Sequence, residues 1–142
     1  MDLRHRGVRL QINNFIEGKF VPPLDGDYLD NYNPATGTIT SRIANSTSKD
    51  VELAVQAAQN SRHYWADLPR HERVDWLRKI ARALELRKDE IASIESMDTG
   101  KPISLAQRVD AARSISNFEF FADHTENLPD LEFKMADATN YV

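Results

Sequence analysis

The 142-residue chain contains no cysteine. This absence excludes a disulfide, a thiolate metal site and a thiol nucleophile among its residues. Its five glycines are scattered and never take the G-x-G-x-x-G spacing of a dinucleotide-binding loop. No apolar run approaches the roughly 18 residues of a membrane span, and the polar residues 1–6 lead into no signal-like segment. We therefore expect a cytoplasmic protein with no membrane partner.

Positive charge is not in excess either. Lys and Arg number 18 against 22 Asp and Glu, which gives a formal net charge of -4 at pH 7. No basic field is available to attract a nucleic acid, so we predict no such partner. Charged residues make up 28% of the chain, which is an ordinary share for a folded domain, and the length suits one domain.

Motifs for metal binding and catalysis are also missing. The four histidines lie in four separate segments, and no two have the helical spacing of metal ligands, so we predict no metal site. No G-x-S-x-G elbow indicates a serine nucleophile. Lys101 follows Gly100, but a phosphate loop needs a glycine five residues before Gly100, where Glu95 stands. We predict no catalytic and no cofactor-binding residue in this chain, and interpret 99–102 as a helix stop.

Two β-hairpins are predicted in the first third of the chain. Short β-prone runs within 11–21 flank Gly18, which can supply a positive φ at a tight turn. The segment 33–37, Asn-Pro-Ala-Thr-Gly, is a strong turn signal because proline presets φ and the asparagine can bond the backbone ahead of it. Antiparallel strands over 28–32 and 38–43 are the natural arrangement on either side of it.

After residue 47 the hydrophobic period changes from two to about 3.6, which predicts three helical stretches. Thr47 and Asp50 have the spacing of a capping box at the first start, and Gly100 ends the second stretch after a bend at 87–89. The stretches cover about 47–67, 69–99 and 104–128. The residues expected on inward faces are Val51, Val55, Ala58 and Trp65, then Val74, Leu77, Ala81 and Leu84, and finally Leu105, Val109, Ala112 and Ile115.

Four motifs resemble landmarks of the aldehyde dehydrogenase superfamily. Residues 12–21 are similar to its "INGxFV" opening, and 33–37 to its N-P-[AS]-T-G. Residues 50–65 are similar to a first helix of the form V-x-x-A-V-x-A-A that ends at tryptophan, and 95–102 match E-x-x-D-x-G-K-P. Because the four occur in the family's order and spacing, the chain from about residue 10 onward resembles the N-terminal part of such an enzyme.

This resemblance implies an α+β fragment, with short antiparallel β elements followed by three α-helices, from the N-terminal part of an α/β NAD-binding domain. Residues 1–10 are then a flexible arm, and 11–142 an incomplete segment whose last residues begin a strand of an oligomerisation sheet. A full-length enzyme of this kind oxidises an aldehyde to the acid with NAD, using a cysteine thiolate and a glutamate-activated water. Those residues lie downstream in the family, so we predict that this chain is inactive by itself.

One arginine receives a role from a narrower resemblance. Residues 110–118 are similar to D-I-P-R-x-x-x-N-F of the 2-aminomuconate and 2-hydroxymuconate semialdehyde dehydrogenases, although Ala111 and Ala112 replace Ile-Pro. The resemblance implies that Arg113 binds a substrate carboxylate, a task suited to the forked guanidinium. Spacing alone leaves Arg113 as a surface residue or as the partner of Asp110, three residues earlier.

Two further interpretations stay open. The helices would keep an apolar face for a sheet that this chain does not supply, and an uncovered apolar face is a docking surface. The chain is then a non-catalytic interaction protein that associates with full-length dehydrogenase subunits, or a possible homo-oligomer. The remaining alternative is an unrelated helical domain that folds alone.

Overall fold

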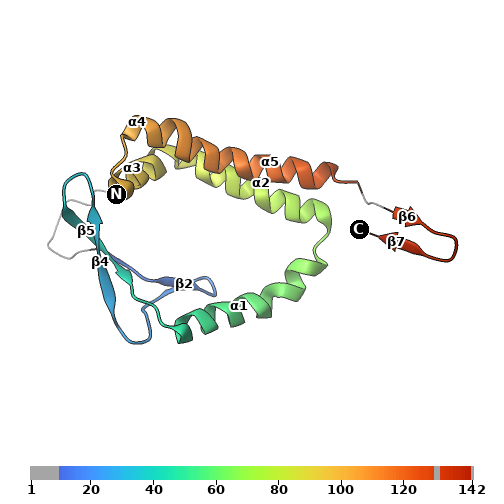
Figure 1. Ribbon diagram of the computed structural model, residues 1–142, viewed down its shortest axis with the longest axis horizontal. Coiled ribbons are helices and arrows are strands. Elements are labelled where there is room, and N and C mark those ends of the chain that lie inside the picture. Colours follow the sequence, from blue (N-terminus) through green and yellow to red (C-terminus); the bar gives the residue numbers. More distant parts are fainter. Residues whose placement is uncertain (1–9, 130–131, 142) are drawn as a thin grey trace.

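The computed structural model describes residues 10–129 and 132–141. Short strands come first, helices follow, and a hairpin comes last (Figure 1). The elements are β1 Leu10–Ile12, β2 Asn14–Ile16, β3 Lys19–Val21, β4 Tyr28–Asn33, β5 Thr38–Ala44, α1 Ser48–Asp67, α2 Arg70–Leu86, α3 Lys88–Thr99, α4 Ile103–Leu105, the π-helix η1 Ala106–Ala111, α5 Ala112–Asn127, β6 Glu132–Lys134 and β7 Thr139–Tyr141. Leu10 of the expected arm is the first residue of β1, and residues 1–9 lie outside the described part.

Both predicted hairpins are confirmed. Strands β2 and β3 pair antiparallel around Glu17 and Gly18, which have φ of 52° and 75°. Positive φ at both central residues matches the twist of the flanking strands. Strands β4 and β5 pair antiparallel around the turn 33–37, where the Gly37 N–H donates to the Asn33 carbonyl at 2.8 Å.

The sheet holds one pairing that the sequence did not predict. Its strand order is β1-β5-β4, and β1 runs parallel to β5 with Leu10 opposite Ser41. We expected antiparallel elements only. A parallel pair joins segments distant in sequence and has no tight turn to announce it. The sheet is therefore mixed, and β5 is its central strand.

The start of α1 is fixed by Asp50. The Thr47 N–H donates to Asp50 Oδ2 at 2.8 Å, and the Leu24 N–H donates to Oδ1 at 2.9 Å. These bonds lower the pKa of Asp50, which is only 4% exposed. The predicted capping box is confirmed. In addition, Asp50 ties the loop before β4 to the first turn of α1.

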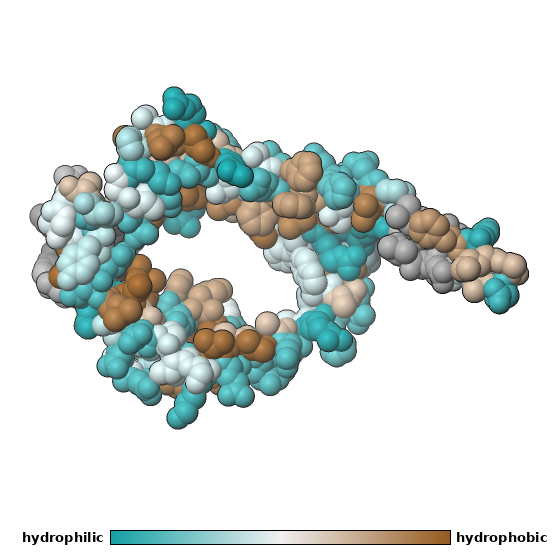
Figure 2. Space-filling view, viewed as in Figure 1, coloured by the Kyte–Doolittle hydropathy of each residue, from teal (hydrophilic) through white to brown (hydrophobic). Residues whose placement is uncertain are grey.

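The face of α1 that we expected to be inward is exposed instead. Val51, Val55 and Trp65 are 57%, 49% and 45% exposed, and Ala58 is exposed as well. Figure 2 shows the molecule open in its centre, with apolar side chains gathered beside the opening. The helical period was correct, but the described residues supply no layer to cover that face.

Helices α2 and α5 pack along each other (Figure 1). In α2 the predicted face is confirmed, because Val74 and Ala81 are buried while Leu77 and Leu84 are half-buried. In the third stretch the prediction is partly wrong. The buried residues are Ala106, Ala111, Ile115 and Ala122, whereas Leu105 and Val109 are 38% and 39% exposed.

The π-helix η1 explains that error. In an α-helix, residues five apart lie about 140° apart around the axis. The i→i+5 bonding of a π-helix brings such residues toward one side, as with Ala106 and Ala111 here. Both pack with Ala92 of α3 in a cluster bordered by Ile91. A stripe drawn at 3.6 residues per turn cannot follow a segment with an extra residue in its turn.

Candidate functional site

The end of α3 packs against the β-turn 33–37. Gly100 has φ of 74° and ends the helix with its N–H donating to the Ser96 carbonyl at 3.0 Å. A Cβ at Gly100 would lie 3.1 Å from Pro34 Cγ and 3.3 Å from Ala35 N. The predicted helix stop is confirmed, and it is also a close contact between two family landmarks that are distant in sequence.

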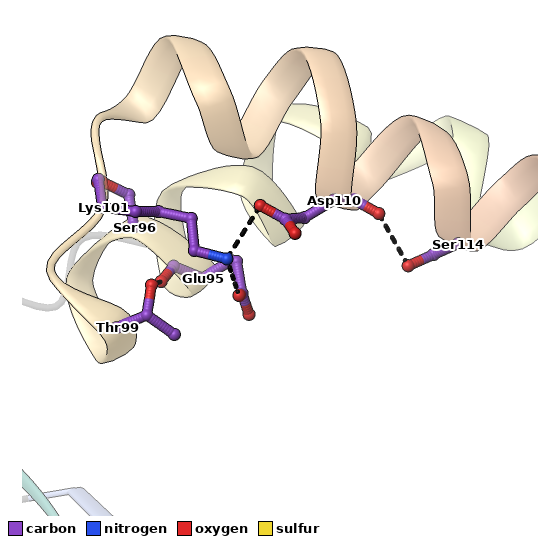
Figure 3. A network of polar contacts seen from close by, with 6 residues as sticks. All are labelled: Glu95, Ser96, Thr99, Lys101, Asp110 and Ser114. Carbon is purple, nitrogen blue, oxygen red and sulfur yellow. Dashed lines mark hydrogen bonds and ion pairs between the residues drawn. The ribbon is translucent and has the colours of Figure 1, made fainter.

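Directly after this stop lies a charged group that we name the Lys101 cluster: Lys101, Glu95 and Asp110 (Figure 3). Lys101 Nζ donates to Glu95 Oε1 at 2.8 Å and to Asp110 Oδ2 at 2.9 Å. The Asp110 carbonyl in turn accepts from Ser114 Oγ at 2.8 Å. The cluster links the end of α3 to η1 and the first turn of α5.

In the Lys101 cluster, a single ammonium binds two carboxylates. Hydrogen bonds to Glu95 and then to Asp110 raise the pKa of Lys101, so its amine stays protonated at neutral pH. A protonated amine is neither a general base nor a nucleophile. Its side chain is 26% exposed, and those of Glu95 and Asp110 are 36% and 33% exposed. The cluster therefore joins the end of α3 to η1 through two charge-assisted hydrogen bonds.

Arg113, the predicted substrate-binding residue, lies in the first turn of α5 and is exposed. Within 10–129 and 132–141 its guanidinium has no ion-pair partner, and Asp110 is bound by Lys101 instead. The alternative of an Asp110–Arg113 pair is not realised. Sequence reasoning did not predict the Lys101–Asp110 pair, because Lys101 lies in the stop between two helices and no helical period relates it to Asp110.

A second charged group joins α2 to α5. Arg78 Nη2 lies 3.0 Å from Asp123 Oδ1 and 2.6 Å from Glu126 Oε2, and these pairs raise the pKa of Arg78 and lower that of Glu126. Beside it is a groove of about 490 Å³. Its lining is Arg78, Ala81, Arg82, Glu85, Glu119 and Asp123. The lining carries both positive and negative charges, and Arg78 is already paired with carboxylates, so the groove indicates no particular class of ligand.

The glycines within 10–129 and 132–141 stand in turns or at a helix end. Gly18, Gly26 and Gly37 lie in loops and turns, and Gly100 ends a helix, so in this part of the chain no glycine-rich loop opens a helix after a strand. Among the described residues, no group of three His, Cys, Asp or Glu could hold a metal ion. No described helix is long and apolar enough to cross a membrane.

Comparisons with known proteins give the family of this chain. The sequence profile of the aldehyde dehydrogenase family matches residues 20–142. The 2-aminomuconic semialdehyde dehydrogenase of Bos taurus is 41% identical over 117 residues, which are 82% of this chain and 24% of that protein. The 2-hydroxymuconic semialdehyde dehydrogenase of Pseudomonas sp. (strain CF600) is 36% identical over 127 residues, or 89% of this chain and 26% of that protein.

Solved structures give the same result for the fold. An aldehyde dehydrogenase structure from Burkholderia cenocepacia superposes with a TM-score of 0.87 at 33% identity, covering 94% of this chain and 27% of that one. The NAD+ complex of an aldehyde dehydrogenase from Bacillus cereus gives 0.85 at 29% identity, covering 92% and 27%. The chain thus spans about a quarter of the length of the proteins that it matches. It belongs to the aldehyde dehydrogenase family.

Proposed function

We propose that this chain is the N-terminal portion of an NAD-dependent aldehyde dehydrogenase whose complete form oxidises a muconic semialdehyde to the carboxylic acid. The observation that carries this proposal is Arg113, an exposed and unpaired guanidinium among the described residues, placed in a segment similar to that of semialdehyde dehydrogenases. A muconic semialdehyde bears a carboxylate at one end and the aldehyde at the other. A forked cation can hold the first while the second reacts.

The test replaces Arg113 in the complete enzyme. Arg113→Met removes the charge, and Arg113→Lys keeps the charge but loses the two-pronged geometry. Hydrogen bonds to charged groups contribute about 1.5–3 kcal/mol, so we expect kcat/KM for a carboxylate-bearing aldehyde to fall about 10- to 100-fold. Oxidation of a neutral aldehyde of similar length should change little. Equal losses with both aldehydes would contradict a role in carboxylate binding.

The chain by itself we propose to be inactive. It has no cysteine, and no glutamate in it stands in a motif that would activate water. Its residues hold no dinucleotide, so the NAD of the complete enzyme belongs to a site built elsewhere. The purified chain, mixed with NAD and an aldehyde, should give no NADH fluorescence. Turnover that persists through chromatography and co-elutes with the chain would disprove this.

A second candidate function is association with longer dehydrogenase subunits. The observation that favours it is the exposed apolar face of α1, where Val51, Val55 and Trp65 are each at least 45% exposed. Such a face favours a partner that removes it from water. We also propose a cytoplasmic location, as part of a possible homo-oligomer or of such a mixed assembly.

Co-expression with a full-length 2-aminomuconic semialdehyde dehydrogenase tests the association. We expect the two chains to co-purify, and the double substitution Val51→Lys and Val55→Lys to separate them. The matched control is Gln56→Lys, which adds charge to the same helix at an exposed polar position. A monodisperse monomer that binds no hydrophobic dye would count against this function.

A further inference from the structure

Asp110 and Arg113 stand at a spacing that would let them bind each other. Residues three apart on a helix are surface neighbours, and an acid–base pair there is stabilising. Asp110 is the penultimate residue of η1, and Arg113 lies in the first turn of α5, which follows directly. If the pair formed, Asp110 would compete with any other carboxylate for the guanidinium.

Lys101 binds Asp110 instead. Its ammonium lies 2.9 Å from Asp110 Oδ2 and 2.8 Å from Glu95 Oε1, and its side chain is 26% exposed. Two features hold it there. The Ser96 hydroxyl donates to the Lys101 carbonyl at 2.6 Å, and the left-handed Gly100 turns the chain just before it. The lysine therefore reaches η1 from a backbone that is already fixed at the end of α3.

We propose that Lys101 is a positioning residue that occupies Asp110 and thereby leaves Arg113 available to a substrate carboxylate. This inference rests on the proposed function of Arg113. It assigns the specificity for a carboxylate-bearing aldehyde to three residues rather than to one. Asp110 is the internal competitor, Lys101 neutralises it, and Arg113 binds the substrate. Removing the Lys101 ammonium would also leave the carboxylates of Glu95 and Asp110 unneutralised near the first turn of α5, where Arg113 lies.

The test uses a chimera in which this chain replaces the matching segment of the bovine 2-aminomuconic semialdehyde dehydrogenase. Lys101→Met should raise KM for a muconic semialdehyde about two- to five-fold, because surface pairs of this kind are worth a few tenths to about 1 kcal/mol. The kcat should change little, as should the kinetics with a neutral aldehyde. Adding Asp110→Asn to Lys101→Met removes the competitor, and KM should return to its original value.

The rescue separates positioning from simple stabilisation. If the Lys101 cluster only held the helices together, the double variant would have lost more contacts and would perform worse than Lys101→Met. The matched control is Lys88→Met, which removes a lysine that lies 3.9 Å from Glu85 at another point of α3. It should leave KM for both aldehydes unchanged.

The failures are distinguishable. If Arg113→Met in the same chimera does not raise KM for the semialdehyde, the proposed anchor is wrong and the inference falls with it. If Arg113→Met raises KM but Lys101→Met does not, or if Asp110→Asn gives no rescue, the anchor stands and the inference is wrong. A chimera that oxidises neither aldehyde with the unsubstituted segment overturns both.

Discussion

Replacing Gly100 with alanine tests the contact that joins the β elements to the helices. Two costs are expected. The first is conformational, because Gly100 has φ of 74° and an L-residue in the left-handed region costs about 1–2 kcal/mol. The second is steric, because the new Cβ would lie 3.1 Å from Pro34 Cγ and 3.3 Å from Ala35 N. A stiff proline ring and a backbone atom give way with difficulty, and overpacking of this kind costs about 1–3 kcal/mol.

The matched control is Gly37→Ala. Gly37 has φ of 68°, and a Cβ there would meet nothing within 4 Å, so this variant carries the conformational cost alone. The lower entropy of the unfolded alanine chain affects both variants equally. The difference between them therefore isolates the steric contact, and Gly100→Ala should be less stable than Gly37→Ala by about 1–3 kcal/mol.

Urea unfolding followed by circular dichroism gives the two free energies, with equal m-values as the condition for comparing them. Hydrogen exchange locates the effect, since the Thr36 and Gly37 N–H groups both donate to the Asn33 carbonyl in the turn that Gly100 touches. We expect faster exchange at Thr36 in Gly100→Ala. Equal losses of stability in the two variants would refute the reasoning that this turn and the α3 stop are packed together.

Two other predictions concern the helix start and the π-helix. The pKa of Asp50 is lowered from 3.8 by the N–H groups of Thr47 and Leu24, so its carboxylate contributes stability above that pH, and the contribution is lost as the pH falls through the depressed folded value. In thermal unfolding, Asp50→Asn should be less stable than the original chain near neutral pH, and its melting temperature should change less as the pH falls through the folded pKa of Asp50. An unchanged dependence of melting temperature on pH would contradict this role of the Asp50 carboxylate. Ala106→Leu places three extra carbons in a fully buried site and should cost about 1–3 kcal/mol in urea unfolding. The exposed Ala54→Leu should stay within about 0.5 kcal/mol, and similar losses in both would argue against the observed register of η1.

Local signals were sufficient for several element boundaries. The Thr47–Asp50 capping box, the turn 33–37 and the Gly100 stop all appear where the sequence predicted them. Each depends on interactions within a few residues, such as a side chain bonding the nearby backbone or a glycine adopting positive φ. The family landmarks have the same local character, and for that reason a sequence of 142 residues was enough to recognise them.

Contacts between distant segments were not predictable in this way. The parallel β1–β5 pair, the packing of Ala106 and Ala111 with Ala92 of α3, and the Lys101–Asp110 bond each join residues that no turn or α-helical period relates. The exposed face of α1 is a similar case, because periodicity gives the direction of a face but not what covers it.

The sequence by itself determined the family, the two β-hairpins before the helices and the absence of a thiol nucleophile, since these follow from residue identity and short-range spacing. Tertiary structure decided which cation Asp110 binds. Asp110 had two candidate cations, and the one nearer in sequence, Arg113, does not bind it. The left-handed turn at Gly100 brings Lys101 to Asp110 instead. Whether a charge is neutralised or available thus depends on how two helices meet.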